Sequence, residues 1–121
     1  MKKHFITYGT NRYFHSKFRL KSQVEKLDIF DTITLYDDKN LSDNFKQKYK
    51  EVLKIQHGGG YWIWKFDIIM QKLQEIEEND FLVYLDAGCT INTNGKSRLL
   101  EYFQMLNDSK YGIMSFQMHH K

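Results

Sequence analysis

The sequence contains no proline and a single cysteine, Cys89. One cysteine cannot form an internal disulfide, and a lone thiol fits a reducing compartment. The absence of proline argues against a Pro-rich linker. No apolar run approaches the ~20 residues of a membrane-spanning helix, and the apolar stretch after Met1 is too short for the hydrophobic region of a signal peptide. These absences predict a cytoplasmic protein without a membrane span.

The charge balance is only mildly basic, with a net charge of +3 and an isoelectric point near 8.9. This suits a small ligand that carries phosphate, whereas a nucleic-acid-binding domain usually shows a sharper basic patch. The lysines are densest on one expected helix, where a solvated face is the simpler interpretation: Lys46, Lys48, Lys50 and Lys54. We therefore expect no nucleic-acid partner.

What the chain does contain is enough apolar and aromatic residues for a folded core. Of its 121 residues, 41% are hydrophobic and 16% are aromatic, which fits a globular domain and excludes a disordered tail. The sequence shows no repeats and no linker, so residues 1–121 are predicted to form one domain.

The order of the expected elements predicts the fold class. Short β-favouring runs predict strands over residues 4–8, 31–36, 81–85 and 111–116. Apolar residues at helical spacing predict helices over residues 16–27, 42–56 and 96–106, and another that follows Gly60 and ends near residues 75–78. Alternating strands and helices predict an α/β three-layer sandwich with a mostly parallel, Rossmann-like sheet, in which the last strand runs parallel or antiparallel.

Some helix details are also predicted. Ser22 and Glu25 match a capping box, which would start the first helix later, and Ser42 or Asp43 can cap the second. The third helix is expected to bury the apolar residues at helical spacing, which are Ile63, Phe66, Met70 and Leu73.

The most informative stretch is the apolar strand at residues 81–85, which runs into Asp86, Ala87 and Gly88. In an open α/β sheet, ligands bind just beyond the carboxyl ends of the strands. The carboxylate of Asp86 is therefore interpreted as a ligand or metal contact, and the small residues let the backbone approach closely. The alternative is that Asp86 only caps the turn.

Two other segments have the content of a binding site. In residues 7–13, Tyr8 or Tyr13 can stack on a base and Arg12 can pair with a phosphate, although an ordinary polar loop has the same composition. The second segment, residues 57–65, has three glycines that free backbone N–H groups for an anion, followed by Trp62, Trp64 and Lys65. One of the two tryptophans is expected in the core.

Other kinds of site have weak signals. The histidines His57, His119 and His120 lack the spacing to a cysteine or an acid that would complete a zinc site. Cys89 has no histidine near it in the sequence, so it is interpreted as a small buried residue rather than a nucleophile. No Walker motif, dinucleotide fingerprint or nucleophile elbow is present.

The combination of residues 60–65, Gly-Tyr-Trp-Ile-Trp-Lys, with residues 80–89, Asp-Phe-Leu-Val-Tyr-Leu-Asp-Ala-Gly-Cys, resembles a known family. It is similar to the nucleotide-sugar-binding half of GT-A-fold glycosyltransferases, in particular bacterial and viral enzymes of capsular polysaccharide and glycan synthesis. The resemblance covers essentially the whole chain. It implies transfer of a sugar from a nucleotide diphosphate sugar to a saccharide or protein acceptor.

The resemblance also implies roles for individual residues. Thr7, Tyr8 and Gly9 would lie against the base and ribose, and Arg12 would lie near the base or the diphosphate. Lys65 would approach the sugar-phosphate, and Trp62 or Trp64 would shape the pocket. Asp86 would be the acid that contacts ribose and a divalent cation, manganese or magnesium, with Ala87 and Gly88 beside it.

The sequence departs from the family in two ways. Gly88 stands where the second acid of an Asp-x-Asp motif would lie, which removes one carboxylate from the metal shell. The chain also ends where such enzymes continue into an acceptor-binding half, so a fragment that pairs with a C-terminal half, or a homo-oligomer, is expected. The alternative function is a non-catalytic domain that binds nucleotide without turnover.

Overall fold

The computed structural model describes residues 1–55, 60 and 62–115. They form an α/β structure whose chain divides into two compact units, Met1–Ile91 and Asn92–Lys121. The first unit holds a parallel sheet with helices on both faces, and the second holds the 3-10 helix η3 (Thr93–Gly95) and the helix α6 (Lys96–Asn107). Within the described residues, no helix has the length and apolar character needed to cross a membrane.

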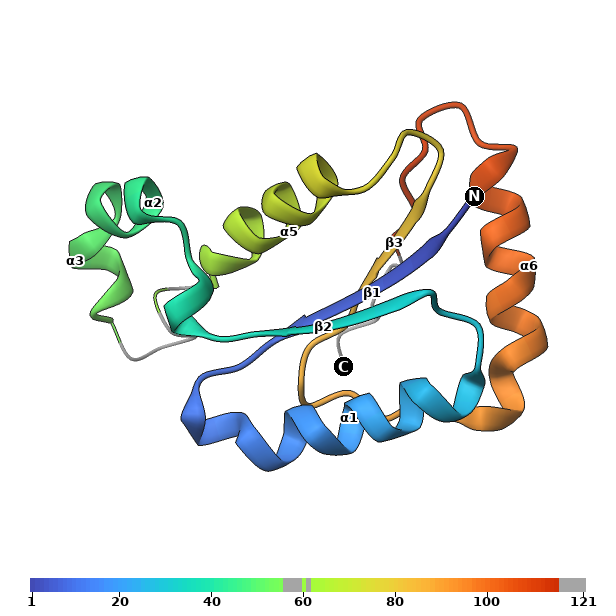
Figure 1. Ribbon diagram of the computed structural model, residues 1–121, viewed down its shortest axis with the longest axis horizontal. Helices are drawn as coiled ribbons and strands as arrows, with labels where there is room; N and C mark the ends of the chain where they lie inside the picture. Colours follow the sequence, from blue (N-terminus) through green and yellow to red (C-terminus); the bar gives the residue numbers. More distant parts are fainter. Residues whose placement is uncertain (56–59, 61, 116–121) are drawn as a thin grey trace, which may run out of the picture. The chain divides into compact units, whose positions relative to one another are not determined.

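The sheet of the first unit consists of β1 (Lys3–Tyr8), β2 (Thr32–Tyr36) and β3 (Phe81–Tyr84), with β1 in the middle (Figure 1). Both neighbours run parallel to β1, and Phe5 faces Ile33 on one side and Val83 on the other. These strands confirm the first three that the sequence predicts, to within a residue or two at each end. All three carboxyl ends therefore meet at one edge.

The helices of the first unit differ in length. They are α1 (Phe14–Leu27), α2 (Asp43–Lys48), α3 (Lys50–Leu53) and α5 (Trp64–Glu75), with the short 3-10 helices η1 (Asn11–Tyr13) and η2 (Asp38–Asn40). Because α1 begins at Phe14, Ser22 lies inside it, and the later start suggested by the capping box was wrong.

The alternation of side chains along β1 divides the core between the two faces of the sheet. Phe5 packs on one face with Leu20 and Val24 of α1. Ile6 and Tyr8 pack on the other face in a cluster that includes Trp64 and Ile68 of α5, together with Tyr36, Leu41 and Phe45. Helix, sheet and helix thus form the three layers expected of an α/β sandwich.

The single helix expected over residues 42–56 was wrong, since the chain forms α2 and α3 with a break at Tyr49. Tyr49 has φ −112° and ψ 26°, outside the helical region, and its ring lies 4.9 Å from that of Phe45. Ser42 does stand at the start of α2, but its hydroxyl donates a 2.8 Å hydrogen bond to Asp67 of α5 instead of capping the helix.

Of the four apolar residues predicted for the inward face of this helix, Ile63 packs against the core, whereas the other three are exposed. Phe66 is 68% exposed and Leu73 is 49% exposed, and Met70 is exposed as well. The buried residues of α5 are Trp64, Asp67, Ile68 and Lys72. Apolar spacing misidentified this face because two of its residues are charged, each with a partner: Asp67 binds Ser42, and Lys72 binds Glu75 at 2.8 Å.

The last expected strand, residues 111–116, is not formed over residues 111–115, and Phe116 lies outside the described residues. Tyr111 is 77% exposed and Ile113 is 80% exposed, which is not expected of residues in a covered strand. Within the part of the chain that the structure describes, the sheet therefore has three strands, all parallel.

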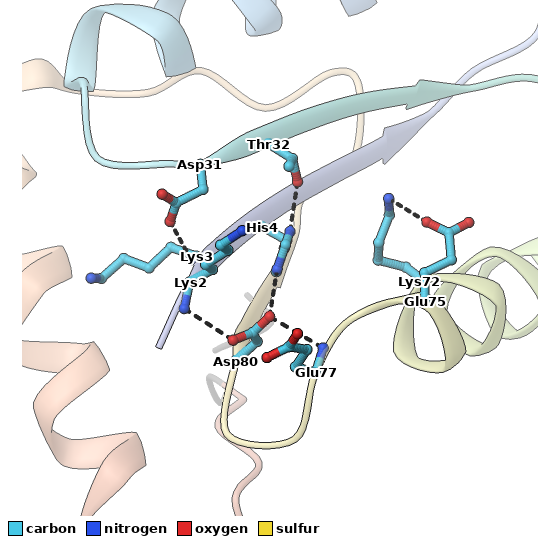
Figure 2. A network of polar contacts seen from close by, with 9 residues as sticks. All are labelled: Lys2, Lys3, His4, Asp31, Thr32, Lys72, Glu75, Glu77 and Asp80. Carbon is cyan, nitrogen blue, oxygen red and sulfur yellow. Dashed lines mark hydrogen bonds and ion pairs between the residues drawn. The ribbon is translucent and has the colours of Figure 1, made fainter.

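A polar network fixes the amino end of the sheet, opposite the edge where the carboxyl ends meet (Figure 2). The ring of His4 hydrogen-bonds Thr32 on β2 at 2.7 Å and Asp80, just before β3, at 2.9 Å. The backbone N–H of Lys2 donates to the same aspartate at 3.0 Å. These bonds hold the pKa of Asp80 below its ordinary value, first through His4 and then through Lys2.

Candidate functional site

A cavity of about 470 Å³ opens at the carboxyl edge of the sheet. It combines residues that follow β1 and β3 with residues that lie between α3 and α5, all within the first unit. Its lining consists of Tyr8, Gly9, Thr10, Arg12, Tyr13, Leu53, Lys54, Ile55, Trp62, Trp64, Asp86, Ala87 and Gly88. The three segments that the sequence singled out therefore meet at one place.

Of the residues predicted for the site, Thr7 and Lys65 are those that do not line the cavity. Thr7 is fully buried, and its hydroxyl donates a 2.7 Å hydrogen bond to the carbonyl of Leu85. This bond holds the end of β3 against β1 and so places the turn that follows. Lys65 lies beside the cavity and reaches a lining residue, Asp86.

One wall of the cavity is aromatic. The rings of Tyr8 and Trp64 are stacked, with centroids 4.0 Å apart and planes 15° apart, and Tyr84 lies 6.3 Å beyond Trp64. Trp64 is buried in the core, as expected of one of the two tryptophans, whereas Trp62 is 47% exposed. Trp62 is therefore the tryptophan with most surface available to a ligand.

The phenol of Tyr8 stays neutral over the physiological range. Burial raises its pKa to about 12, and the negative charges of Asp38 and Asp37 add to the effect. At the cavity wall, Tyr8 therefore presents an uncharged ring that does not repel an anion.

The backbone around Trp62 is unusual. Trp62 has φ +61°, a left-handed conformation that is rare for a bulky residue, and Gly60 has φ +98°. A side chain on Gly60 would lie 2.9 Å from the backbone of Leu53, so the glycine lets this segment pass close to α3. Strain of this kind persists only where the surrounding structure holds it, and here it sets where the Trp62 side chain projects.

The carboxylate of Asp86 is held by two donors. Tyr84 donates a 2.6 Å hydrogen bond to its Oδ1, and the ammonium of Lys65 lies 3.1 Å from the same oxygen. Burial and then this hydrogen bond raise the pKa of the Tyr84 phenol. The turn itself is closed by its backbone, since the N–H of Cys89 donates to the carbonyl of Asp86 at 2.9 Å. The carboxylate of Asp86 thus contacts Tyr84 and Lys65, and its contact with a ligand stays a prediction.

Two aromatic rings also position Lys65. Its ammonium lies 5.8 Å from the centroid of Trp64 and 5.4 Å from that of Tyr84, within the usual range of cation–π contacts. The side chain remains 36% exposed. These contacts thus hold the ammonium of Lys65 in place while leaving part of the side chain accessible to an anion.

The two glycines of the cavity lining have different surroundings. A Cβ on Gly9 would lie 2.9 Å from the Cβ of Tyr13 and 3.2 Å from Lys17, so the chain can pass α1 here only without a side chain. A Cβ on Gly88 would meet nothing within 4 Å. The space beside Gly88 is therefore open.

Sequence reasoning missed the residues that fix the Asp86 turn from outside. Arg19 of α1 donates to the carbonyl of Cys89 at 2.9 Å and to the hydroxyl of Thr90 at 3.1 Å. Gln23, one helical turn later, accepts from the N–H of Ile91 at 2.9 Å. No local signal marks these residues, because their partners lie about 70 positions away. The sequence also did not single out Lys54 and Ile55, which line the cavity.

The described residues contain no group of three His, Cys, Asp or Glu side chains placed to hold a metal. Among the lining residues, Asp86 supplies the one carboxylate, and its Oδ1 already faces the ammonium of Lys65. The histidines His57, His119 and His120, and Gly58, Gly59 and Tyr61 of the glycine segment, lie outside the described residues.

No protein-family model matches the sequence, and neither a curated protein nor a solved structure matches it. The function is therefore inferred from the geometry of the site.

Proposed function

We propose that the chain binds a nucleotide diphosphate sugar as the donor-binding domain of a GT-A-like glycosyltransferase. The observation that carries this proposal is the meeting of the three segments, residues 7–13, 60–65 and 86–88, around one cavity. The cavity lies beyond the carboxyl ends of parallel strands, where open α/β sheets bind ligands. Its volume of about 470 Å³ is within the range of small-molecule sites.

The aromatic groups of the site suit a nucleobase. The exposed ring of Trp62 offers a flat apolar surface, and Tyr13, which also lines the cavity, is about half exposed. Base–aromatic stacking contributes about 1–3 kcal/mol and tolerates any base, because every base has a π face. The aromatic lining therefore supports nucleotide binding without indicating which base is preferred.

The charges of the site suit a diphosphate. Arg12 and Lys54 line the cavity and Lys65 lies at its margin, whereas Asp86 is the carboxylate among the lining residues. An arginine can pair two phosphate oxygens at once, and lysine acts as a point charge. In sugar transfer, the bond between the anomeric carbon and the diphosphate breaks while the acceptor oxygen bonds that carbon. Cations at the diphosphate stabilise the negative charge that develops on it.

A second candidate is a domain that binds the nucleotide without turnover. An acceptor hydroxyl must lose a proton as it attacks, which usually requires a positioned base. Asp86, the carboxylate in the described lining, accepts from Tyr84 and pairs with Lys65, so it is poorly placed to take that proton. This candidate predicts nucleotide binding without donor hydrolysis or transfer.

Intrinsic fluorescence tests nucleotide binding directly, because both tryptophans of the chain line the cavity. We expect diphosphates of uridine, guanosine, adenosine and cytidine, titrated separately, to include at least one that changes the emission saturably. Arg12→Ala should weaken that binding. Lys21→Ala is the control, since it removes an exposed cation that pairs with Glu25 on α1.

Incubation with the corresponding nucleotide sugars separates the two candidates. Release of free sugar, or its transfer to a saccharide acceptor, supports an enzyme, whereas binding without release supports the second candidate. A chain whose emission responds to none of the four diphosphates would contradict both.

A further inference from the structure

We infer that Lys65 occupies the place of a metal ion at this site, so that the cavity binds a diphosphate without a divalent cation. The inference rests on the proposed function and names the group that neutralises the diphosphate. The resemblance implies instead that a manganese or magnesium ion on Asp86 neutralises the diphosphate.

The first observation is the position of the ammonium. Lys65 Nζ lies 3.1 Å from Oδ1 of Asp86, the carboxylate that would otherwise receive the metal. A magnesium ion binds a carboxylate oxygen at about 2.0–2.1 Å, so on Oδ1 it would lie within about 5 Å of the ammonium and the two cations would repel each other. A cation on this oxygen would therefore compete with Lys65.

The second observation is that the ammonium is held where it is. It contacts the carboxylate of Asp86 and lies within cation–π range of the rings of Trp64 and Tyr84. Tyr84 also donates to the same Oδ1 at 2.6 Å, which leaves this oxygen less able to take a metal. An ammonium has three N–H donors, so contact with Asp86 leaves donors for phosphate oxygens.

The third observation concerns Gly88. A second carboxylate at this position would make the turn a two-acid cation site, and a Cβ there would meet nothing within 4 Å. The position therefore has room for the acid that a divalent site would use, while the sequence has glycine. The ammonium of Lys65 faces Asp86 and would also face the diphosphate, and Arg12 and Lys54 of the lining add positive charge, although Lys54 also lies 3.6 Å from Glu51.

The test measures the affinity of the full chain for the four nucleoside diphosphates by tryptophan fluorescence, in EDTA and in manganese chloride. We expect the wild-type dissociation constant in EDTA to be within about twofold of that in manganese. Lys65→Met should weaken binding in EDTA by at least about tenfold, the factor that corresponds to loss of 1.4 kcal/mol. Lys21→Met is the matched control and should bind as the wild type does.

A double variant makes the test specific to the cation. Lys65→Met with Gly88→Asp removes the ammonium and adds the second acid. We expect it to bind weakly in EDTA and to recover in manganese, which a merely structural role of Lys65 would not produce. Circular dichroism and thermal melting confirm that each variant is folded.

Several results would overturn the inference. These are wild-type binding that requires manganese, Lys65→Met binding that is unchanged in EDTA, or a double variant that manganese does not restore. With either of the first two results the chain would still bind nucleotide, so the proposed function would not be contradicted. Absence of binding by the wild type under both conditions would instead contradict the proposed function as well.

Discussion

Gly9 and Gly88 lie on the same cavity but tolerate a side chain differently. Beside Gly9, the nearest atom to an added Cβ is the Cβ of Tyr13 at 2.9 Å, and this atom cannot rotate away. Beside Gly88 the space is open. Gly9 is therefore required for the approach of the β1 loop to α1, whereas Gly88 is free to vary without cost to the fold.

This contrast predicts the effect of adding one methyl group at each position. Gly9→Ala should lower the free energy of unfolding by about 1–3 kcal/mol, because the start of α1 must move. Gly88→Ala should change it by no more than about 0.5 kcal/mol. Urea denaturation measures both. Equal losses of stability in the two variants would contradict the close approach of Tyr13 to Gly9.

At the opposite end of the sheet, Asp80 makes stability depend on pH. Its pKa is below the ordinary 3.8, so the carboxylate stabilises the fold fully above that value. This stabilisation is lost as the pH falls through the lowered pKa, because the protonated group can no longer accept as well from His4 and Lys2.

Asp80→Asn should therefore be less stable than the wild type at pH 7, and the difference should shrink as the pH falls below 3.8. Urea unfolding over a series of pH values measures the difference. Asp28→Asn, at the exposed end of α1, is the control. A difference between Asp80→Asn and the wild type that stays constant with pH would contradict the role of the charged carboxylate.

At the scale of the elements, α5 shows where sequence patterns mislead. Phe66, Met70 and Leu73 repeat at helical spacing, yet the helix buries Ile68 and the charged residues Asp67 and Lys72. Each charged residue reaches a partner, Ser42 or Glu75, which lowers the cost of burying it. A hydrophobic pattern counts only apolar residues, so it leaves out Asp67 and Lys72. It cannot show that a partner elsewhere in the chain or on the next helical turn allows their burial.

The two faces of α5 should respond differently to truncation. Ile68→Ala should lower the free energy of unfolding by about 2–5 kcal/mol, because Ile68 is fully buried. Phe66→Ala removes a larger side chain that is 68% exposed, and it should cost much less. Thermal or urea unfolding of the two variants checks this. A larger loss of stability for Phe66→Ala than for Ile68→Ala would indicate that Phe66 packs inward, as the sequence predicts.

The strands were easier to predict than the helices. Residues 4–8 and 81–85 are short β-favouring runs bounded by polar residues, and β1 is largely buried and β3 partly buried in the sheet, so composition identifies both strands. The break at Tyr49 has no proline or glycine to mark it and depends on packing against Phe45. No strand forms over residues 111–115, because an apolar run alone does not supply the hydrogen-bonding partner that a strand requires.

At the scale of the whole first unit, parallel strands explain why the site was predictable. The sequence identified residues after β1 and β3, and strands that run in the same direction bring such residues to one edge. Gly9, Asp86 and Trp64 therefore meet although they are far apart in the sequence. The supports of the site were not predictable, because Arg19 and Gln23 act through contacts that only the folded chain creates.

The same arrangement decides what the cavity is suited to bind. Exposed aromatic surface at Trp62 and Tyr13 lies beside the cations Arg12 and Lys54, and Lys65 neutralises Asp86. Flat apolar surface next to positive charge matches the two parts of a nucleoside diphosphate, its base and its phosphates. Binding of this ligand is the claim on which enzyme, binding domain and metal independence all depend.

The most direct measurement is the titration of the wild-type chain and Arg12→Ala with the four nucleoside diphosphates in EDTA, followed by tryptophan emission. The account predicts a saturable change for at least one diphosphate below about 1 mM, the upper end of usual substrate affinities, and weaker binding by Arg12→Ala. Emission that stays unchanged for all four, in EDTA and in manganese, would contradict it.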